Sequence, residues 1–140
     1  PDLEMKSITI TVPIPARELS PNSRAHWRTK ANAKRDARAV ASWRAKFCLA
    51  EYAEGQPRWE RASARVTFYW PDARRRDPDN AMASLKATWD GIADAGIVAN
   101  DSGIWPERPH FGIDRMNPRV EITITQENDK DLARRALDSE

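Results

Sequence analysis

The amino-acid sequence predicts a single α/β domain over residues 1–126, followed by a polar tail over residues 127–140. Residues 7–12 and 61–70 alternate apolar and polar side chains with the period of a half-buried strand. Between them, residues 31–52 carry apolar side chains at helical spacing. The chain has 140 residues and is 40% apolar, which is enough for one domain with a modest core.

The first strand and the first helix follow from simple signals. The strand has the sequence SITITV, and Pro13 and Pro15 end it. The helix is rich in alanine and charge. Its apolar side chains recur at i, i+3, i+7 and i+10, at Val40, Trp43, Phe47 and Ala50. We therefore expect these four side chains to form its packed face.

The second half of the chain is expected to add two strands and a helix. Residues 61–70 (RASARVTFYW) are the clearest strand, and residues 119–125 (RVEITIT) are the last one. Asp79 is a natural N-cap for a helix over residues 80–95, which Gly96 ends. The apolar stripe of this helix is Met82, Leu85, Trp89 and Ile92. Residues 105–118 are expected to be loop with at most one weak strand.

The composition excludes several classes of protein. No stretch is long and apolar enough to cross a membrane, and no apolar signal segment is present, so we expect a soluble cytoplasmic protein with no membrane partner. Cys48 is the only cysteine, which excludes an internal disulfide. One cysteine and two histidines are too few to build a structural zinc site.

A concentrated basic region indicates a polyanionic partner. Residues 24–46 contain eight Lys or Arg residues against one acid, Asp36, although the whole chain has a net charge of only +2. A solvated helix face would have the same composition. Trp27 and Trp105 lie in polar segments, so they are candidates for stacking on a ligand, whereas the other tryptophans are expected in the core.

The motif RRRDPDN, residues 74–80, places three cations beside two carboxylates. Pro78 favours an extended Asp77, so the side chains of Asp77 and Asp79 would point to one side, roughly 6–7 Å apart at the backbone. Two ionised carboxylates at that range repel each other and usually need a cation. The motif is therefore either a charged turn that neutralises itself or a site for Mg²⁺ or Mn²⁺, which prefer oxygen ligands.

Two further features of the second helix bear on this choice. At about 100° per residue, Asp79, Lys86 and Asp90 share the helix face opposite the apolar stripe. Lys86 and Asp90 could be an ordinary i, i+4 ion pair or part of a metal site. The extended segment after Gly96 could also return Asp101 close to Asp79. A carboxylate-bound metal beside a basic surface suits chemistry on phosphate esters.

The arrangement of these motifs resembles the RusA family of phage-type Holliday junction resolvases. The resemblance rests on RRRDPDN, on Lys86 and the DGI at residues 90–92, and on the AGI at residues 95–97 followed by Asp101. It extends to the proline-rich LSPNSRAHWR, the basic helix and the last strand, and so covers residues 7–125.

The resemblance implies a small α/β homodimer with a mixed sheet and two main helices. It also implies paired, symmetric, Mg²⁺-dependent nicking of four-way DNA junctions in a bacterial or phage-infected cell, during recombination or repair. The implied metal ligands are Asp77, Asp79 and Asp101, with Lys86 as the catalytic lysine. The implied DNA-binding residues are Arg24, Arg28, Lys30, Lys34, Arg35, Arg74, Arg75 and Arg76.

The sequence departs from the family pattern in two places. Familiar members have the lysine four residues after the second aspartate, where this chain has Ala83, so Lys86 implies nearly one extra helical turn. The familiar pair of aspartates is Asn100 and Asp101 here, and Asn100 could be a neutral ligand or none. Alternative functions are a nuclease of the same fold for forks or flaps, and a non-catalytic structure-selective DNA-binding protein.

Overall fold

A computed structural model of the chain describes residues 6–51, 57–127 and 137. The predicted tail lies outside the described residues apart from residues 127 and 137. The described elements are β1 (Ser7–Val12), η1 (Arg17–Leu19), α1 (Trp27–Ala50), β2 (Ala62–Trp70), α2 (Pro78–Ala83), α3 (Lys86–Asp94), η2 (Asp101–Gly103), β3 (Ile104–Pro106), β4 (His110–Ile113) and β5 (Arg119–Gln126).

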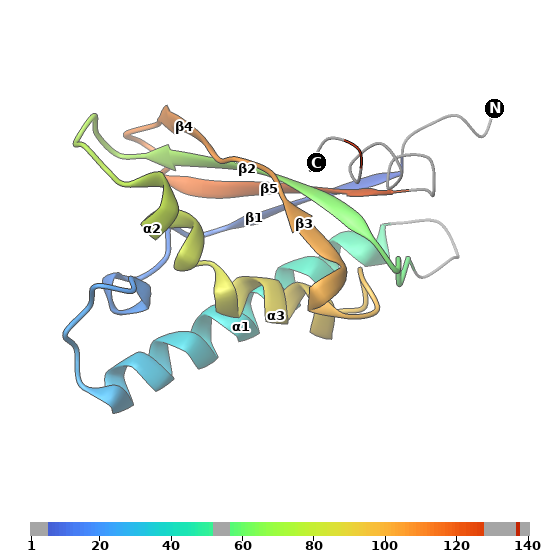
Figure 1. Ribbon diagram of the computed structural model, residues 1–140, viewed down its shortest axis with the longest axis horizontal. Helices are drawn as coiled ribbons and strands as arrows, with labels where there is room; N and C mark the ends of the chain where they lie inside the picture. Colours follow the sequence, from blue (N-terminus) through green and yellow to red (C-terminus); the bar gives the residue numbers. More distant parts are fainter. Residues whose placement is uncertain (1–5, 52–56, 128–136, 138–140) are drawn as a thin grey trace.

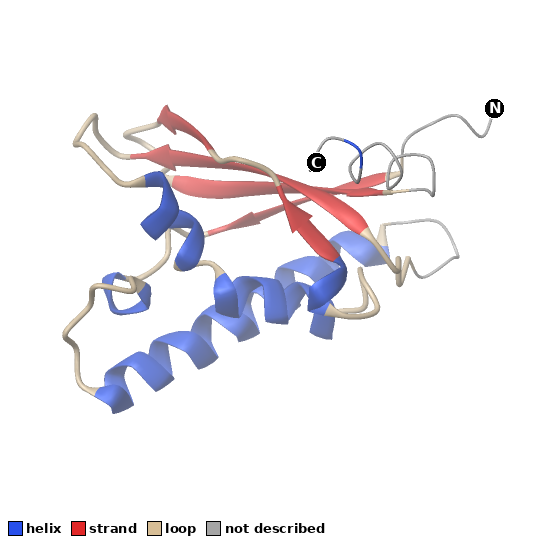
Figure 2. Ribbon diagram, viewed as in Figure 1, coloured by secondary structure: helices blue, strands red, loops and turns tan. Residues whose placement is uncertain are grey.

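The strands form one mixed sheet with the helices on one of its faces (Figure 1 and Figure 2). β5 lies between β1 and β2 and is antiparallel to both. β3 and β4 run parallel to β2 along its other edge, one after the other. The α/β fold with a mixed sheet is thus confirmed. The expected loop over residues 105–118 contributes to two short strands, because both can hydrogen-bond to the free edge of β2.

The core lies between the sheet and the helices. Alternate side chains of the three long strands are buried, and the register places Ile10 and Val66 on either side of Ile122. The opposite face of the sheet is polar, with a hydrogen bond of 3.0 Å between the hydroxyls of Thr9 and Thr123. The strand periodicity in the sequence therefore predicted the buried face correctly.

The packed face of α1 was predicted wrongly. Its buried side chains are Ala41, Ala45 and Leu49, whereas Trp43 and Phe47 are 63% and 62% exposed. The reason is the close approach of α1 and α3. A β-carbon on Gly91 would lie 2.9 Å from the Ala41 Cβ and would collide with the carbonyl oxygen of Arg38. Only small side chains fit where the two helices meet.

The predicted helix over residues 80–95 is divided into α2 and α3. Ser84 and Leu85 form a turn between them, and the Ser84 hydroxyl donates a hydrogen bond of 2.6 Å to the Ala81 carbonyl. The predicted apolar stripe is confirmed, since Leu85, Trp89 and Ile92 are buried and Met82 packs against the core. Gly96 ends the segment with a φ of 92°, a conformation that favours glycine.

An ion pair joins α1 to α3 beside the Gly91 contact. The Arg38 guanidinium donates two hydrogen bonds to the Asp94 carboxylate, Nε to Oδ2 at 2.6 Å and Nη2 to Oδ1 at 2.8 Å. These bonds from Arg38 lower the pKa of Asp94. No described helix is long and apolar enough to cross a membrane.

Replacing Gly91 with alanine should destabilise the protein by about 1–3 kcal/mol, because the added methyl group forces α1 and α3 apart. Chemical denaturation monitored by circular dichroism measures this change. In an unconstrained helix the same substitution stabilises by up to about 1 kcal/mol. An increase in stability would therefore contradict the close packing at Gly91.

Replacing Arg38 with alanine should raise the pKa of Asp94 toward the ordinary carboxyl value of about 3.9, because the ionised form loses two hydrogen bonds. In the native protein the lowered pKa of Asp94 means that the ion pair stabilises the fold fully at pH values above the ordinary carboxyl pKa. This stabilisation is lost as the pH falls through the lowered pKa. Carboxyl-detected NMR titration of Asp94 measures the change.

Arg35→Ala is the matched control for this titration, because Arg35 lies on the same helix and bonds to Asn32 instead of an acid. It should leave the pKa of Asp94 unchanged. If the Arg38 and Arg35 variants give the same Asp94 pKa, the Arg38–Asp94 pair does not form in solution.

Candidate nucleic-acid interface

The two carboxylates of RRRDPDN lie where β2 gives way to α2, and they have different local roles. Asp77 is the N-cap of α2, and its Oδ1 accepts a hydrogen bond of 2.9 Å from the Asp79 backbone N–H. Pro78 occupies the first position of the helix, where its missing N–H costs nothing. The extended conformation of Asp77 is confirmed, with φ −82° and ψ 120°.

Two expectations about this pair were wrong. Asp77, instead of Asp79, caps the helix. Asp79 lies in the first turn of α2, so residues 77–79 are not an extended segment with two parallel side chains. The proline explains both differences, because it favours an extended residue before it and a helical conformation after it. Both carboxylates remain exposed to solvent.

The three arginines of the motif also differ from one another in their contacts. The Arg76 side chain is 19% exposed and folds back onto the chain. Its guanidinium donates hydrogen bonds to the Asp72 carboxylate and carbonyl and to the Arg74 carbonyl, and it lies 4.4 Å from the centroid of a Trp70 ring. The Arg74 and Arg75 side chains are exposed, and Arg74 Nη2 lies 3.9 Å from Asp72 Oδ2. Arg76 thus orders the loop, and the other two cations are available to a ligand.

Lys86 contacts two carboxylates, one that is four residues away on the same helix and one that is 15 residues away. Its Nζ donates hydrogen bonds of 2.8 Å to Asp90 Oδ1 and 2.9 Å to Asp101 Oδ2. Asp101 reaches this position because the chain turns at Gly96 and then runs beside Trp59, through a parallel bridge to Val98. The i, i+4 ion pair considered for Lys86 and Asp90 is present, and Asp101 joins it.

The contacts in this cluster shift two pKa values in opposite directions. The hydrogen bonds to Asp90 and Asp101 raise the pKa of Lys86. The hydrogen bond from Lys86 lowers the pKa of Asp101. The two shifts favour the charged forms of Lys86 and Asp101. Asn100 is engaged nearby, since its side-chain oxygen accepts a hydrogen bond of 3.1 Å from the Ser102 N–H.

The structure brings only some of the predicted site residues together. Lys86 and Asp101 are in contact, and Asp77 and Asp79 are joined by the helix cap. Within the described part of the chain, no three His, Cys, Asp or Glu side chains are grouped so that they could hold a metal ion. Asp90 is a site residue that sequence reasoning left out of its catalytic set, although its helical spacing from Lys86 was a usable signal.

A groove of about 640 Å³ connects this cluster to the basic helix. Its basic lining residues are Lys30, Lys34, Arg35, Arg38 and Lys86. Two acids, Glu18 and Asp90, also line it. A smaller hollow of about 260 Å³ contains Asp77 and Asn80 and shares Ser20 and Ser84 with the groove. The hollow at Asp77 and Asn80 is therefore adjacent to the groove at Lys86 and Asp90.

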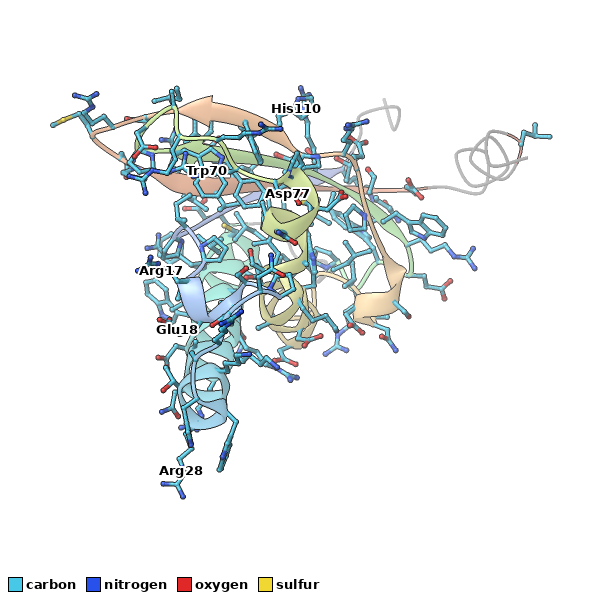
Figure 3. All side chains as sticks on the ribbon, turned by 60° about the vertical axis from the view of Figure 1, so that its left-hand side comes forward. Arg17, Glu18, Arg28, Trp70, Asp77 and His110 are labelled. Atoms are coloured by element: carbon cyan, nitrogen blue, oxygen red, sulfur yellow. The ribbon has the colours of Figure 1, made fainter. Side chains whose placement is uncertain are left out.

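The predicted DNA-binding residues of α1 are placed along this groove and beyond its end. Lys30, Lys34 and Arg35 line the groove, whereas Arg24 and Arg28 are exposed near the start of the helix. Figure 3 shows Arg28 at the end of α1 that lies far from the sheet, with Arg17 and Glu18 between it and Asp77. The basic surface thus extends from the protruding end of α1 toward the Lys86 cluster.

Comparisons with known proteins leave the family of this chain open. No family model matches it. An uncharacterized protein of Xylella fastidiosa (strain Temecula1) is 36% identical over 91 residues, which are 62% of this chain and 56% of that protein. The chain thus spans about half the length of this curated relative. Thiamine-monophosphate kinase from Stenotrophomonas maltophilia matches 89% of this chain and 32% of its own, with 12% identity and a TM-score of 0.35, which is too low to assign a fold.

Proposed function

We propose that this protein is a divalent-metal-dependent endodeoxyribonuclease of the RusA type that cuts four-way DNA junctions. The observation that carries the proposal is the basic groove of α1 that ends at the Lys86–Asp90–Asp101 cluster. A nuclease needs cations to hold the phosphate backbone and charged groups at the cut. The choice of a four-way junction as the substrate rests on the resemblance of the motifs to the RusA family.

The groove is suited to phosphates and not to bases. Its five basic side chains outnumber its two acids, and they come from α1 and α3 together. Cations that contact phosphates fix the position of a duplex without reading its sequence. We therefore propose that Lys30, Lys34 and Arg35 position one arm of the junction and that Arg74 and Arg75 contact the backbone near Asp77.

Lys86 is the proposed catalytic lysine. Its side chain is exposed, and its ammonium is directed by Asp90 and Asp101 on two sides. A non-bridging or leaving oxygen of a phosphodiester in the groove would accept a hydrogen bond from the third N–H of the ammonium. Lys86 would then stabilise negative charge that develops on that oxygen during cleavage.

Mg²⁺, with Mn²⁺ as a substitute, is the proposed cofactor, held by Asp77, Asp79 and Asp101. These residues offer only oxygen donors, as Mg²⁺ requires. In phosphate chemistry Mg²⁺ is commonly bound by one or two carboxylates together with the substrate, so a preformed group of three is not needed. When bound, the ion would supply Lewis-acid polarisation of the phosphodiester.

A second candidate function is non-catalytic, structure-selective binding of branched DNA. The ion pairs that already neutralise Lys86, and the absence of a metal-holding group among the described residues, favour it. A nuclease of the same fold acting on forks or flaps uses the same groove, and only the choice of DNA substrate separates it from a junction resolvase.

We propose that the active form is a homodimer built on the exposed aromatic pair of α1. The rings of Trp43 and Phe47 lie 6.2 Å apart between centroids, and both project into solvent. Adjacent exposed aromatics of this size mark a contact surface. A two-fold axis through the pair would let each side chain meet its counterpart, and a two-fold dimer matches the symmetry of a four-way junction.

Cleavage of a synthetic four-way junction with Mg²⁺ tests the function. The native protein should give paired symmetric nicks, and EDTA should abolish them. Asp77→Asn should reduce cleavage by on the order of 100-fold or more, because the charge is lost while the capping oxygen is kept. Lys86→Ala should reduce cleavage to a similar extent. Junction binding should remain in both variants, as measured by gel shift.

Each outcome separates the candidates. Junction binding without nicks, unchanged by Asp77→Asn, supports the non-catalytic protein. Faster cleavage of forks or flaps than of junctions supports the nuclease with another substrate. If Lys86→Ala cleaves like the native protein while Asp77→Asn is inactive, Lys86 has no catalytic role.

Replacing Phe47 with glutamate should halve the mass measured by analytical ultracentrifugation, because two added charges would face each other across the proposed dimer axis. Met116→Glu is the matched control, since Met116 is also an exposed apolar side chain but lies outside α1. It should leave the mass unchanged. A native protein with the mass of one chain would exclude the homodimer.

A further inference from the structure

Trp27 is the first residue of α1 and its side chain is 67% exposed. The end of the helix that carries it points away from the sheet (Figure 3). From Trp27 to Arg38, where α1 is clamped to α3, the helix rises by about 16 Å. An indole at this position contributes nothing to the core, and its exposure needs another explanation.

The phase of α1 places Trp27 on the same side as the groove. At about 100° per residue, Trp27, Lys30, Lys34 and Arg38 fall within about 80° of one another around the helix. The buried Ala41 and Ala45 fall within the same sector. In its second half, this face of α1 packs on α3. In its first half, the same face carries the Trp27 indole followed by the cations of Lys30, Lys34 and Arg38.

The indole is held by its neighbours. The His26 ring lies 5.6 Å from the Trp27 ring between centroids, at an interplanar angle of 31°. The Arg28 guanidinium lies 5.3 Å from the Trp27 ring. His26 is itself fixed as the N-cap of α1, because its Nδ1 accepts a hydrogen bond of 3.1 Å from the Arg28 N–H. An exposed aromatic ring that contacts side chains next to it loses less freedom when it binds a flat ligand.

We propose that Trp27 stacks on an unpaired DNA base while the adjacent cations of α1 hold the phosphates of the same strand. Bases in an intact duplex are stacked on one another and offer no free face, so such a contact selects unpaired nucleotides. A basic track with an aromatic side chain is the combination that proteins use for single-stranded nucleic acid. The track from Trp27 to Arg38 is about 16 Å long, so a short single strand could contact the indole and the cations together.

This inference rests on the proposed function and sharpens it, since it assigns the preference for branched DNA to a named residue. The unpaired base would lie at or near the branch point, and the phosphate to be cut would lie at the Lys86 end of the groove. A linear duplex would occupy the cations without engaging Trp27.

The test compares binding to a labelled 12-nucleotide oligothymidylate and to a 12-base-pair duplex, by fluorescence anisotropy in EDTA. Trp27→Ala should weaken binding of the single strand about 5- to 100-fold and leave duplex binding within twofold. Trp27→Phe, which keeps a stacking ring, should recover most of the loss. Lys34→Ala should weaken the binding of both DNAs, because phosphate contact does not depend on base pairing.

Trp43→Ala is the matched control. Trp43 is 63% exposed, lies beside Arg44 with a ring-to-guanidinium distance of 5.6 Å, and sits on the opposite side of α1. Each subunit can bind a short single strand by itself, so Trp43→Ala should leave its affinity unchanged even if the dimer dissociates. Thermal melts of all variants establish that they are folded.

The proposal is wrong if Trp27→Ala loses the same affinity for both DNAs, or loses none. It is also wrong if Trp43→Ala loses as much single-strand affinity as Trp27→Ala. If the native protein binds neither DNA, the stacking role fails, and the proposed function is decided separately by junction cleavage. If single-strand binding depends on Trp27 but no junction is cleaved, the stacking role stands and the nuclease does not. If junctions are cleaved while Trp27→Ala changes nothing, only the stacking role is lost.

Discussion

The contact between α1 and α3 at Gly91 is the constraint on which the rest of the structure depends. The absence of a side chain at Gly91 lets α3 approach the backbone of α1 at Arg38, and the Arg38–Asp94 ion pair holds the helices beside this contact. Because α3 begins with Lys86, the same contact fixes the lysine cluster against the basic face of α1. The width of the groove is therefore set by side-chain volume at a position outside the groove.

Local signals predicted the three long strands but not β3 and β4, and they misplaced the packed face of α1. The alternation in β1, β2 and β5 has a period that only one buried face can satisfy, so the buried residues followed directly. In α1 the large residues Trp43 and Phe47 had the helical spacing of a core face, yet three small or medium residues at positions 41, 45 and 49 fill it. Which of the two faces of α1 packs depends on the partner helix. The residue pattern of α1 alone does not indicate that Gly91 of α3 lies against it.

The candidate site was predicted in part for similar reasons. The contact of Lys86 with Asp90 follows from helical spacing. The glycine turn returns Asp101 toward the helix, where it contacts Lys86, whereas the sequence led us to expect it close to Asp79. The separate roles of the arginines could not be predicted, because Arg76 is drawn inward by Trp70 and Asp72, a contact that requires the folded end of β2. RRRDPDN thus combines a loop that orders itself with exposed charges of both signs.

The position of β5 in the sheet has a consequence for biosynthesis. β1 has no partner strand in the described fold other than β5, and the ladder joins Ser7 to Thr125. Nearly the whole domain must therefore leave the ribosome before the first strand can find its place. Until then β1 exposes an unpaired edge and an apolar face, and contacts of such long sequence separation form slowly. A chain that ends before β5 would contain both helices that shape the groove but lack the strand that joins β1 to β2.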